Sequence, residues 1–222
     1  MVSMQAKKIA AARSPALRIF YQYQIRTFQA DQFVFIDESG TDRRIGFRKT
    51  AWSPLGVAPI QHQALSRGER WQILPAYTLD GILAYDVYQG STDLSAFEKF
   101  LESCVLPKCN PFPAKNSVLV MDNASFHHSE RIREMCEEAD VKLVCLPPYS
   151  PDFNPIEEFF SELKAYIKRH WDIYVNMTNR THKDFSVYLR LCIDQVGNRK
   201  ESARGHFRHA GLDVDGLCLR LK

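Results

Sequence analysis

The chain has 222 residues, a length that suits one large domain or a domain with short extensions. Its composition, with 45% hydrophobic and 25% charged residues, is that of a globular protein with a substantial core. No apolar run approaches the roughly 20 residues of a membrane helix, and the first thirty residues lack a signal-peptide pattern. We therefore expect neither a membrane anchor nor secretion.

The net charge of +3 is unevenly distributed along the chain. Residues 1–30 carry a net charge of +5, residues 31–162 a net charge of −8 and residues 163–222 a net charge of +6. An acidic centre between basic ends is typical of a cation site inside a nucleic-acid groove, although simple surface solvation gives the same pattern. The six cysteines include no C-x-x-C pair, so we expect reduced thiols and no zinc site.

The first half of the chain predicts one helix followed by strands. A basic helical lead-in occupies residues 1–30, with the helix itself expected over 14–28. A short buried strand follows at 33–37, and the arginine-rich stretch 44–52 predicts a twisted hairpin. Asp80-Gly81 separates the β-rich runs 70–78 and 82–88, which predicts a second hairpin.

The second half predicts helices that alternate with strands. Strands are expected at 117–122 and 141–146, and helices at 92–104, 129–139, 155–170 and 184–196. Asn154 is the predicted N-cap of the 155–170 helix, and Pro155 lies in its first turn. This order predicts an α/β fold with a ribonuclease H-like mixed sheet and flanking helices, over residues 31–172. A basic helical extension is predicted for residues 173–222.

Three carboxylates are the candidate catalytic residues. Asp37 and Asp122 each end a hydrophobic strand, where a charge is a poor packing choice unless it meets water or a cation. Two such strands side by side would bring the carboxylates together, and their repulsion favours a divalent cation as partner. Glu157 lies in the first turn of a helix, from which it would reach over the strand ends.

Basic side chains near these carboxylates are the predicted DNA contacts. Two lie on the helix face of Glu157 and three in the hairpin after Asp37, although solvated faces are the alternative interpretation. Asn123 and His127 follow Asp122 closely and are candidates to support the site or touch a phosphate, while capping or packing explains them as well. The predicted DNA-binding residues are Arg44, Arg48, Lys49, Lys164 and Lys168.

Three stretches, FVFIDESG, VLVMDNASFHHS and LPPYSPDFNPIEEFFSELK, resemble the catalytic core of mariner-superfamily transposases, which carry a DDE triad. The 34 residues between Asp122 and Glu157 match one large branch of the superfamily, and PYSPDFNPIE is its most specific signature. The resemblance covers about residues 30–170 and is most familiar from fungal members. It implies a metal-dependent endonuclease and strand transferase, active in DNA transposition and integration in the nucleus.

The resemblance also implies cofactors and partners. Two Mg²⁺ ions, for which Mn²⁺ can substitute, would be held by Asp37, Asp122 and Glu157, with Asp37 bridging both. The implied partners are double-stranded DNA and either a second copy or a full-length transposase, with no membrane. Family members carry two N-terminal helix-turn-helix units, for which thirty residues are too few. The alternative is therefore a non-catalytic relic or host-adapted fragment that modulates full-length transposase; a hybrid nuclease or junction resolvase is a third reading.

Overall fold

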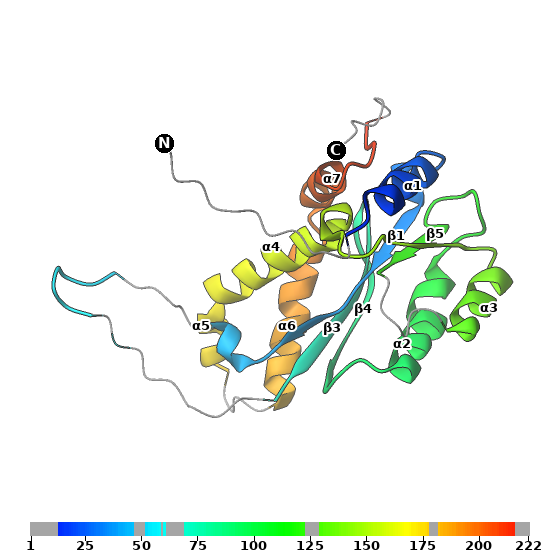
Figure 1. The fold of residues 1–222 in the computed structure, drawn as a ribbon. Coiled ribbons are helices and arrows are strands. Elements are labelled where there is room, and N and C mark those ends of the chain that lie inside the picture. Colours follow the sequence, from blue (N-terminus) through cyan, green and yellow to red (C-terminus); the bar gives the residue numbers. More distant parts are fainter. Residues whose placement is uncertain are drawn as a thin grey trace, which may run out of the picture.

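The computed structural model of the chain describes residues 13–46, 52–58, 60, 69–122, 129–177 and 182–215. These residues form a six-stranded mixed sheet with helices on both faces, which confirms the predicted fold class (Figure 1). No helix within the described ranges is long and apolar enough to cross a membrane.

The sheet combines an antiparallel half with a parallel half. Its strand order is β2-β3-β1-β5-β6. The sixth strand, β4, lies outside this order and also pairs with β3. β3 runs antiparallel to β1, β2 and β4, whereas β1, β5 and β6 are parallel neighbours. The strands are β1 (Phe33–Ile36), β2 (Ser39–Thr41), β3 (Trp71–Thr78), β4 (Gly81–Gln89), β5 (Val118–Met121) and β6 (Lys142–Cys145).

Seven α-helices cover the two faces of the sheet in the described part of the chain. In Figure 1, α4 and α6 lie on one face of the sheet, and α2 and α3 lie on the other. A π-helical turn, Leu101–Val105, extends α2. The helices are α1 (Pro15–Ile25), α2 (Leu94–Phe100), α3 (Glu130–Glu138), α4 (Pro155–Arg169), α5 (Trp171–Val175), α6 (His182–Gly197) and α7 (Lys200–His209).

Alternating strand residues build two separate cores. Phe33 and Phe35 of β1 pack in the core that also receives buried residues of α1, α4, α6 and α7. Val34 and Ile36 point the other way and pack with residues of α2 and α3. Because successive strand side chains face opposite sides of a sheet, four-residue strands with four buried side chains need a helical layer on each face.

The structure confirms most predicted elements and corrects one. The Asp80-Gly81 hairpin joins β3 to β4, and Asn154 caps α4 by accepting a hydrogen bond from the Ile156 N–H. The hairpin predicted over 44–52 is wrong over its described first residues, because residues Arg43–Gly46 form a 3₁₀ turn. A Cβ on Gly46 would lie 1.9 Å from the Trp171 ring, so this turn is fixed by a tertiary contact. Residues 47–51 lie outside the described residues.

The C-terminal helices belong to the same core as α4. Phe185 and Tyr188 of α6 and Phe207 of α7 are at most 1% exposed and pack in the core on the α4 face. The Tyr188 hydroxyl also donates to the Ile167 carbonyl at 2.8 Å. α6 therefore stabilises α4 directly. The domain boundaries at residues 30 and 172 stay predictions.

Candidate active site

The parallel register of β1 and β5 brings Asp37 and Asp122 together. Ile36 lies opposite Met121, so the next residue of each strand leaves the sheet at the same edge. Phe35 and Val120, two positions before the aspartates, belong to the core on the α4 face. Alternation along the strands therefore directs both carboxylates toward α4.

Asn154 connects Asp37 to the start of α4. Its Nδ2 donates to Asp37 Oδ2 at 2.9 Å, and the backbone N–H of Glu38 donates to Asp37 Oδ1 at 2.8 Å. Asn154 is only 5% exposed, and its Oδ1 accepts from the Ile156 N–H at 3.3 Å. One amide therefore caps the helix and orients the strand-end carboxylate. The sequence pattern predicts only the capping role of Asn154.

Glu157 projects from the first turn of α4, three residues after Asn154, and is exposed. The negative charge of Glu157 acts on Asp37 and helps to raise its pKa. Burial is the main cause that raises the pKa of Asp37 from 3.8 to about 7, against the opposing effect of the Glu38 N–H. The charges of Asp122, Glu157 and Glu38 raise the same pKa further. The three predicted carboxylates thus form one electrostatic cluster that disfavours the ionised form of Asp37.

The chemistry of this cluster fits a hard divalent cation. Carboxylate oxygens are the ligands that Mg²⁺ and Mn²⁺ prefer, and a cation would offset the repulsion that raises the pKa of Asp37. Among the residues that the structure describes, no three His, Cys, Asp or Glu side chains lie close enough to share one ion as they stand.

The predicted DNA-binding residues divide into three groups. Lys164 and Lys168 are exposed on α4, and the Lys164 ammonium lies 5.8 Å from the centroid of the Phe160 ring. Arg44 is exposed in the 3₁₀ turn that packs against α4, and its Nε donates to Asp42 Oδ2 at 2.8 Å. Outside the described residues lie Arg48, Lys49, Asn123 and His127.

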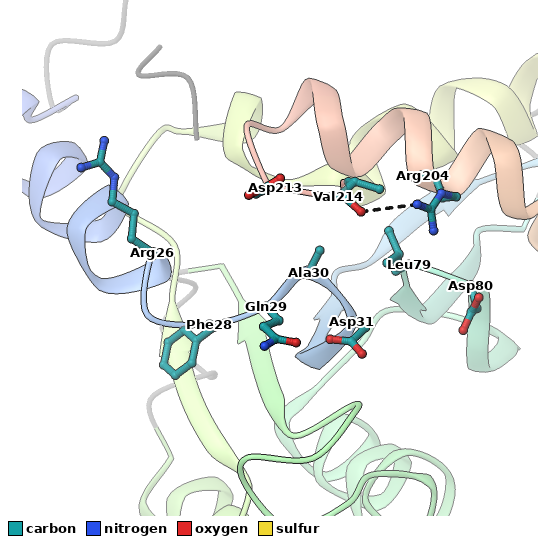
Figure 2. A pocket seen from close by; sticks show the side chains of 10 residues that line it. All are labelled: Arg26, Phe28, Gln29, Ala30, Asp31, Leu79, Asp80, Arg204, Asp213 and Val214. Atoms are coloured by element: carbon teal, nitrogen blue, oxygen red, sulfur yellow. Dashed lines mark hydrogen bonds between the residues drawn. The ribbon is translucent and has the colours of Figure 1, made fainter. Parts of the chain in front are cut away.

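A concave region lies at the end of the sheet opposite to Asp37, where β1 begins and β3 turns into β4 (Figure 2). Its volume is about 880 Å³. Several of its charges already have partners: Arg204 donates to the Val214 carbonyl at 3.4 Å, and Asp80 pairs with Lys115 and Lys200. The three predicted carboxylates do not line it. The lining residues are Arg26, Phe28, Gln29, Ala30, Asp31, Leu79, Asp80, Arg204, Asp213 and Val214.

Comparisons with known proteins identify the family and the fold of the chain. The sequence profile of the DDE superfamily endonuclease family matches residues 32–174. Among curated proteins, none matches the chain. The fold is similar to that of Mos1 transposase in its paired-end complex with the left transposon end, with a TM-score of 0.59 and 14% identity over 92% of this chain and 66% of that one.

Two further solved structures are similar to the chain. The Mos1 mariner paired-end complex with Mn has a TM-score of 0.52 and 13% identity, over 92% of this chain and 67% of that one. The Mos1 transposase catalytic domain with Raltegravir and Mg has a TM-score of 0.56 and 12% identity, over 93% of this chain and 99% of that one. At these identities the likeness shows the fold, which is that of a ribonuclease H-like transposase catalytic domain. The chain spans 66% of the Mos1 chain in the left-end complex.

Proposed function

The chain belongs to the DDE superfamily endonuclease family, and from this premise we propose that it cleaves DNA phosphodiesters and transfers the freed 3′-hydroxyl to target DNA, as the catalytic domain of a transposase. One observation carries the proposal. Asp37 and Asp122 leave adjacent parallel strands at the same edge, and Asn154 ties Asp37 to the helix that presents Glu157.

Asp37, Asp122 and Glu157 are the residues that would hold two Mg²⁺ or Mn²⁺ ions. When bound, such ions would supply Lewis-acid stabilisation to the reacting oxygens of a phosphodiester. The chain itself orients Asp37 through Asn154 Nδ2 and the Glu38 N–H. Support for these metals comes from the donor chemistry of the cluster and from the Mos1 structures solved with Mg and with Mn.

The basic residues beside the carboxylates would hold the DNA backbone. Lys164 and Lys168 follow Glu157 at offsets of seven and eleven along α4, so they lie on the same side of the helix. Arg44 lies on the turn that packs against α4 and would add a further phosphate contact. Each neutralised phosphate steepens the salt dependence of binding. Arg48 and Lys49 would be further phosphate contacts. Asn123 and His127, which follow Asp122 in the sequence, would support the site or touch a phosphate.

Two further elements belong to the proposal. The partner would be double-stranded DNA together with a second copy of the chain or a full-length transposase, for which the paired-end complexes of Mos1 are the support. The place of action would be the nucleus, where chromosomal DNA is found.

A plasmid-nicking assay tests the proposed activity. Purified protein is incubated with supercoiled plasmid and Mn²⁺ or Mg²⁺, and nicked circles are quantified on a gel. We expect nicking that needs the metal, disappears in Asp122→Ala and persists in Asp172→Ala, a control at an exposed aspartate of α5. Equal nicking by the wild type and Asp122→Ala would contradict the proposal. Salt-sensitive DNA binding without cleavage would favour a non-catalytic fragment instead.

A further inference from the structure

A double-arginine ion pair fastens α1 to the loop between β6 and α4. Arg13 Nη2 donates to the two carboxylate oxygens of Asp152 at 2.8 and 2.9 Å. Arg18 donates through Nη1 and Nη2 to the same two oxygens at 3.0 and 2.8 Å. Hydrogen bonds between charged groups are the stronger ones, and here four of them converge on one carboxylate.

Aromatic contacts reinforce this ion pair at the next residue. Phe153 is 3% exposed; the Arg18 guanidinium lies 3.9 Å from its ring centroid, and the Tyr21 ring stacks on it at 5.4 Å. The side chains of Arg13 and Arg18 are only 22% and 15% exposed, so water screens the pair less than it screens an ordinary surface ion pair. Partial burial favours protonation of Asp152, but the arginines outweigh it and lower its pKa.

The loop that α1 holds is the loop that builds the candidate metal site. Asp152 and Phe153 lie in the 3₁₀ turn Pro151–Phe153, which leads directly into Asn154. Asn154 then donates to Asp37 and caps α4, whose first turn carries Glu157. A short 3₁₀ turn leaves little freedom between Asp152 and Asn154, so anchoring the first fixes the position of the second.

We infer that Asp152 is a positioning residue for the metal site, and that Arg13, just before α1, and Arg18 of α1 act through it. In this role, α1 holds the turn at the distance where the Asn154 amide meets Asp37. The positioning role rests on the proposed metal-dependent function. The ordering of the loop by the ion pair does not, because it requires no metal.

The chain offers a matched control in a second aspartate bound by two arginines. Asp215 pairs with Arg208 at 2.9 Å and with Arg204 at 3.5 Å, after the end of α7. Removing the charge of either aspartate breaks the same kind of ion pair. Only Asp152 connects to the loop before α4, so a general loss of surface ion pairing would affect the two variants alike.

Hydrogen–deuterium exchange of the full chain without metal tests the ordering of the loop. We expect Asp152→Asn to speed exchange about tenfold in residues 150–158 while β1 and β5 stay protected. Asp215→Asn should leave residues 150–158 unchanged, Arg13→Gln should give a smaller increase than Asp152→Asn, and Asp152→Glu should restore part of the protection. Unchanged exchange in residues 150–158 of Asp152→Asn, or equal increases throughout the chain, would overturn the inference.

Mn²⁺ binding by the same variants separates this inference from the proposed function. We expect Asp152→Asn to weaken Mn²⁺ binding about tenfold and Asp215→Asn to leave it unchanged. A wild type that binds Mn²⁺, together with an Asp152→Asn variant that binds it equally well, overturns the positioning role alone. A wild type that binds no Mn²⁺ overturns the proposed function, and the positioning role with it.

Discussion

Two aspartates at opposite ends of the sheet occupy opposite electrostatic environments. At the carboxyl end of β1, burial and the charges of Asp122 and Glu157 contribute to raising the pKa of Asp37 to about 7. At the other end, the hydrogen bond from Lys115 is the main cause that lowers the pKa of Asp80, and Lys200 lowers it further. The cavity of about 880 Å³ lies at the Asp80 end (Figure 2).

Under the proposed function, the end of the sheet that binds the metal is marked by uncompensated charge and not by the cavity. An aspartate paired with lysines has reached a stable arrangement and needs no ligand. At Asp37, burial first and carboxylate repulsion second raise the pKa and disfavour the ionised form, and a bound cation would offset that cost. Stability favours the first arrangement, and metal-dependent chemistry requires the second.

The largest expected effect is on nicking activity, when one carboxylate charge is removed at either end of the sheet. Glu157→Gln keeps the size of the side chain but removes a proposed metal ligand, and we expect nicking to fall by a factor on the order of 10² to 10³. Asp80→Asn should leave nicking unchanged, because Asn-Gly suits the β3–β4 turn as well as Asp-Gly does. Plasmid nicking measures both variants, and comparable losses in the two would remove the distinction between the ends.

The next effect concerns the amide that orients Asp37. Asn154→Ser keeps an N-cap but removes the donor to Asp37 Oδ2, so we expect Mn²⁺ affinity to fall roughly 10- to 100-fold. Asn154→Ala should lose the same affinity and also about 1 kcal/mol of stability, because the cap is gone. Calorimetric titration and urea unfolding separate the two losses. Wild-type affinity in Asn154→Ser would show that the hydrogen bond does not support the site.

A third effect is the pH dependence of metal binding. Because the pKa of Asp37 is raised to about 7 without metal, binding must displace its proton at lower pH. We expect affinity to fall about tenfold per pH unit below that value and to level off above it. The stability of the metal-free protein changes in the opposite sense: the Asp37 contribution is complete below the ordinary pKa of 3.8, falls as the pH rises from there, and is lost once the pH passes about 7. An affinity independent of pH between 5 and 7 would contradict the raised pKa.

The smallest expected effect is on the stability of the metal-free protein, and its sign differs between the two ends of the sheet. Asp122→Asn removes a charge that repels Asp37, so we expect it to stabilise the metal-free protein by about 1 kcal/mol at pH 8 and less at pH 5. Lys115→Ala removes an attractive partner of Asp80 and should destabilise the protein by less than about 1 kcal/mol, because that pair is exposed. Urea unfolding without metal tests both. Destabilisation by Asp122→Asn at pH 8 would argue against repulsion within the carboxylate cluster.

The part of the site that could be predicted from sequence is the part encoded locally. Asp37 and Asp122 end short hydrophobic runs, and Asn154-Pro155 marks the start of α4, so each position follows from neighbouring residues. The bond from Asn154 to Asp37 joins residues 117 positions apart, and no local pattern indicates it. One chemical signal was present in the sequence: an asparagine cap keeps an amide donor after capping, whereas an ionised aspartate cap keeps none.

Other features depended on tertiary contacts. The ion pair of Arg13 with Asp152 spans 139 positions, and the sequence around Arg13 predicts only a basic helical lead-in. Gly46 lies in a 3₁₀ turn because Trp171 packs against its Cα, where a pattern of arginines and apolar residues favoured a strand. α7 escaped prediction as a separate helix because only Ala203 and Phe207 are buried in it, too few to give a periodic pattern.

Metal binding by Asp37 decides whether the carboxylate cluster is a metal site. Calorimetric titration of Mn²⁺ into the wild type, Asp37→Ala and the control Asp80→Ala at pH 8 measures it. We expect the wild type and Asp80→Ala to bind Mn²⁺, and Asp37→Ala to lose more affinity than the roughly 10- to 100-fold expected for supporting residues. Equal Mn²⁺ binding by the wild type and Asp37→Ala would show that Asp37 holds no metal.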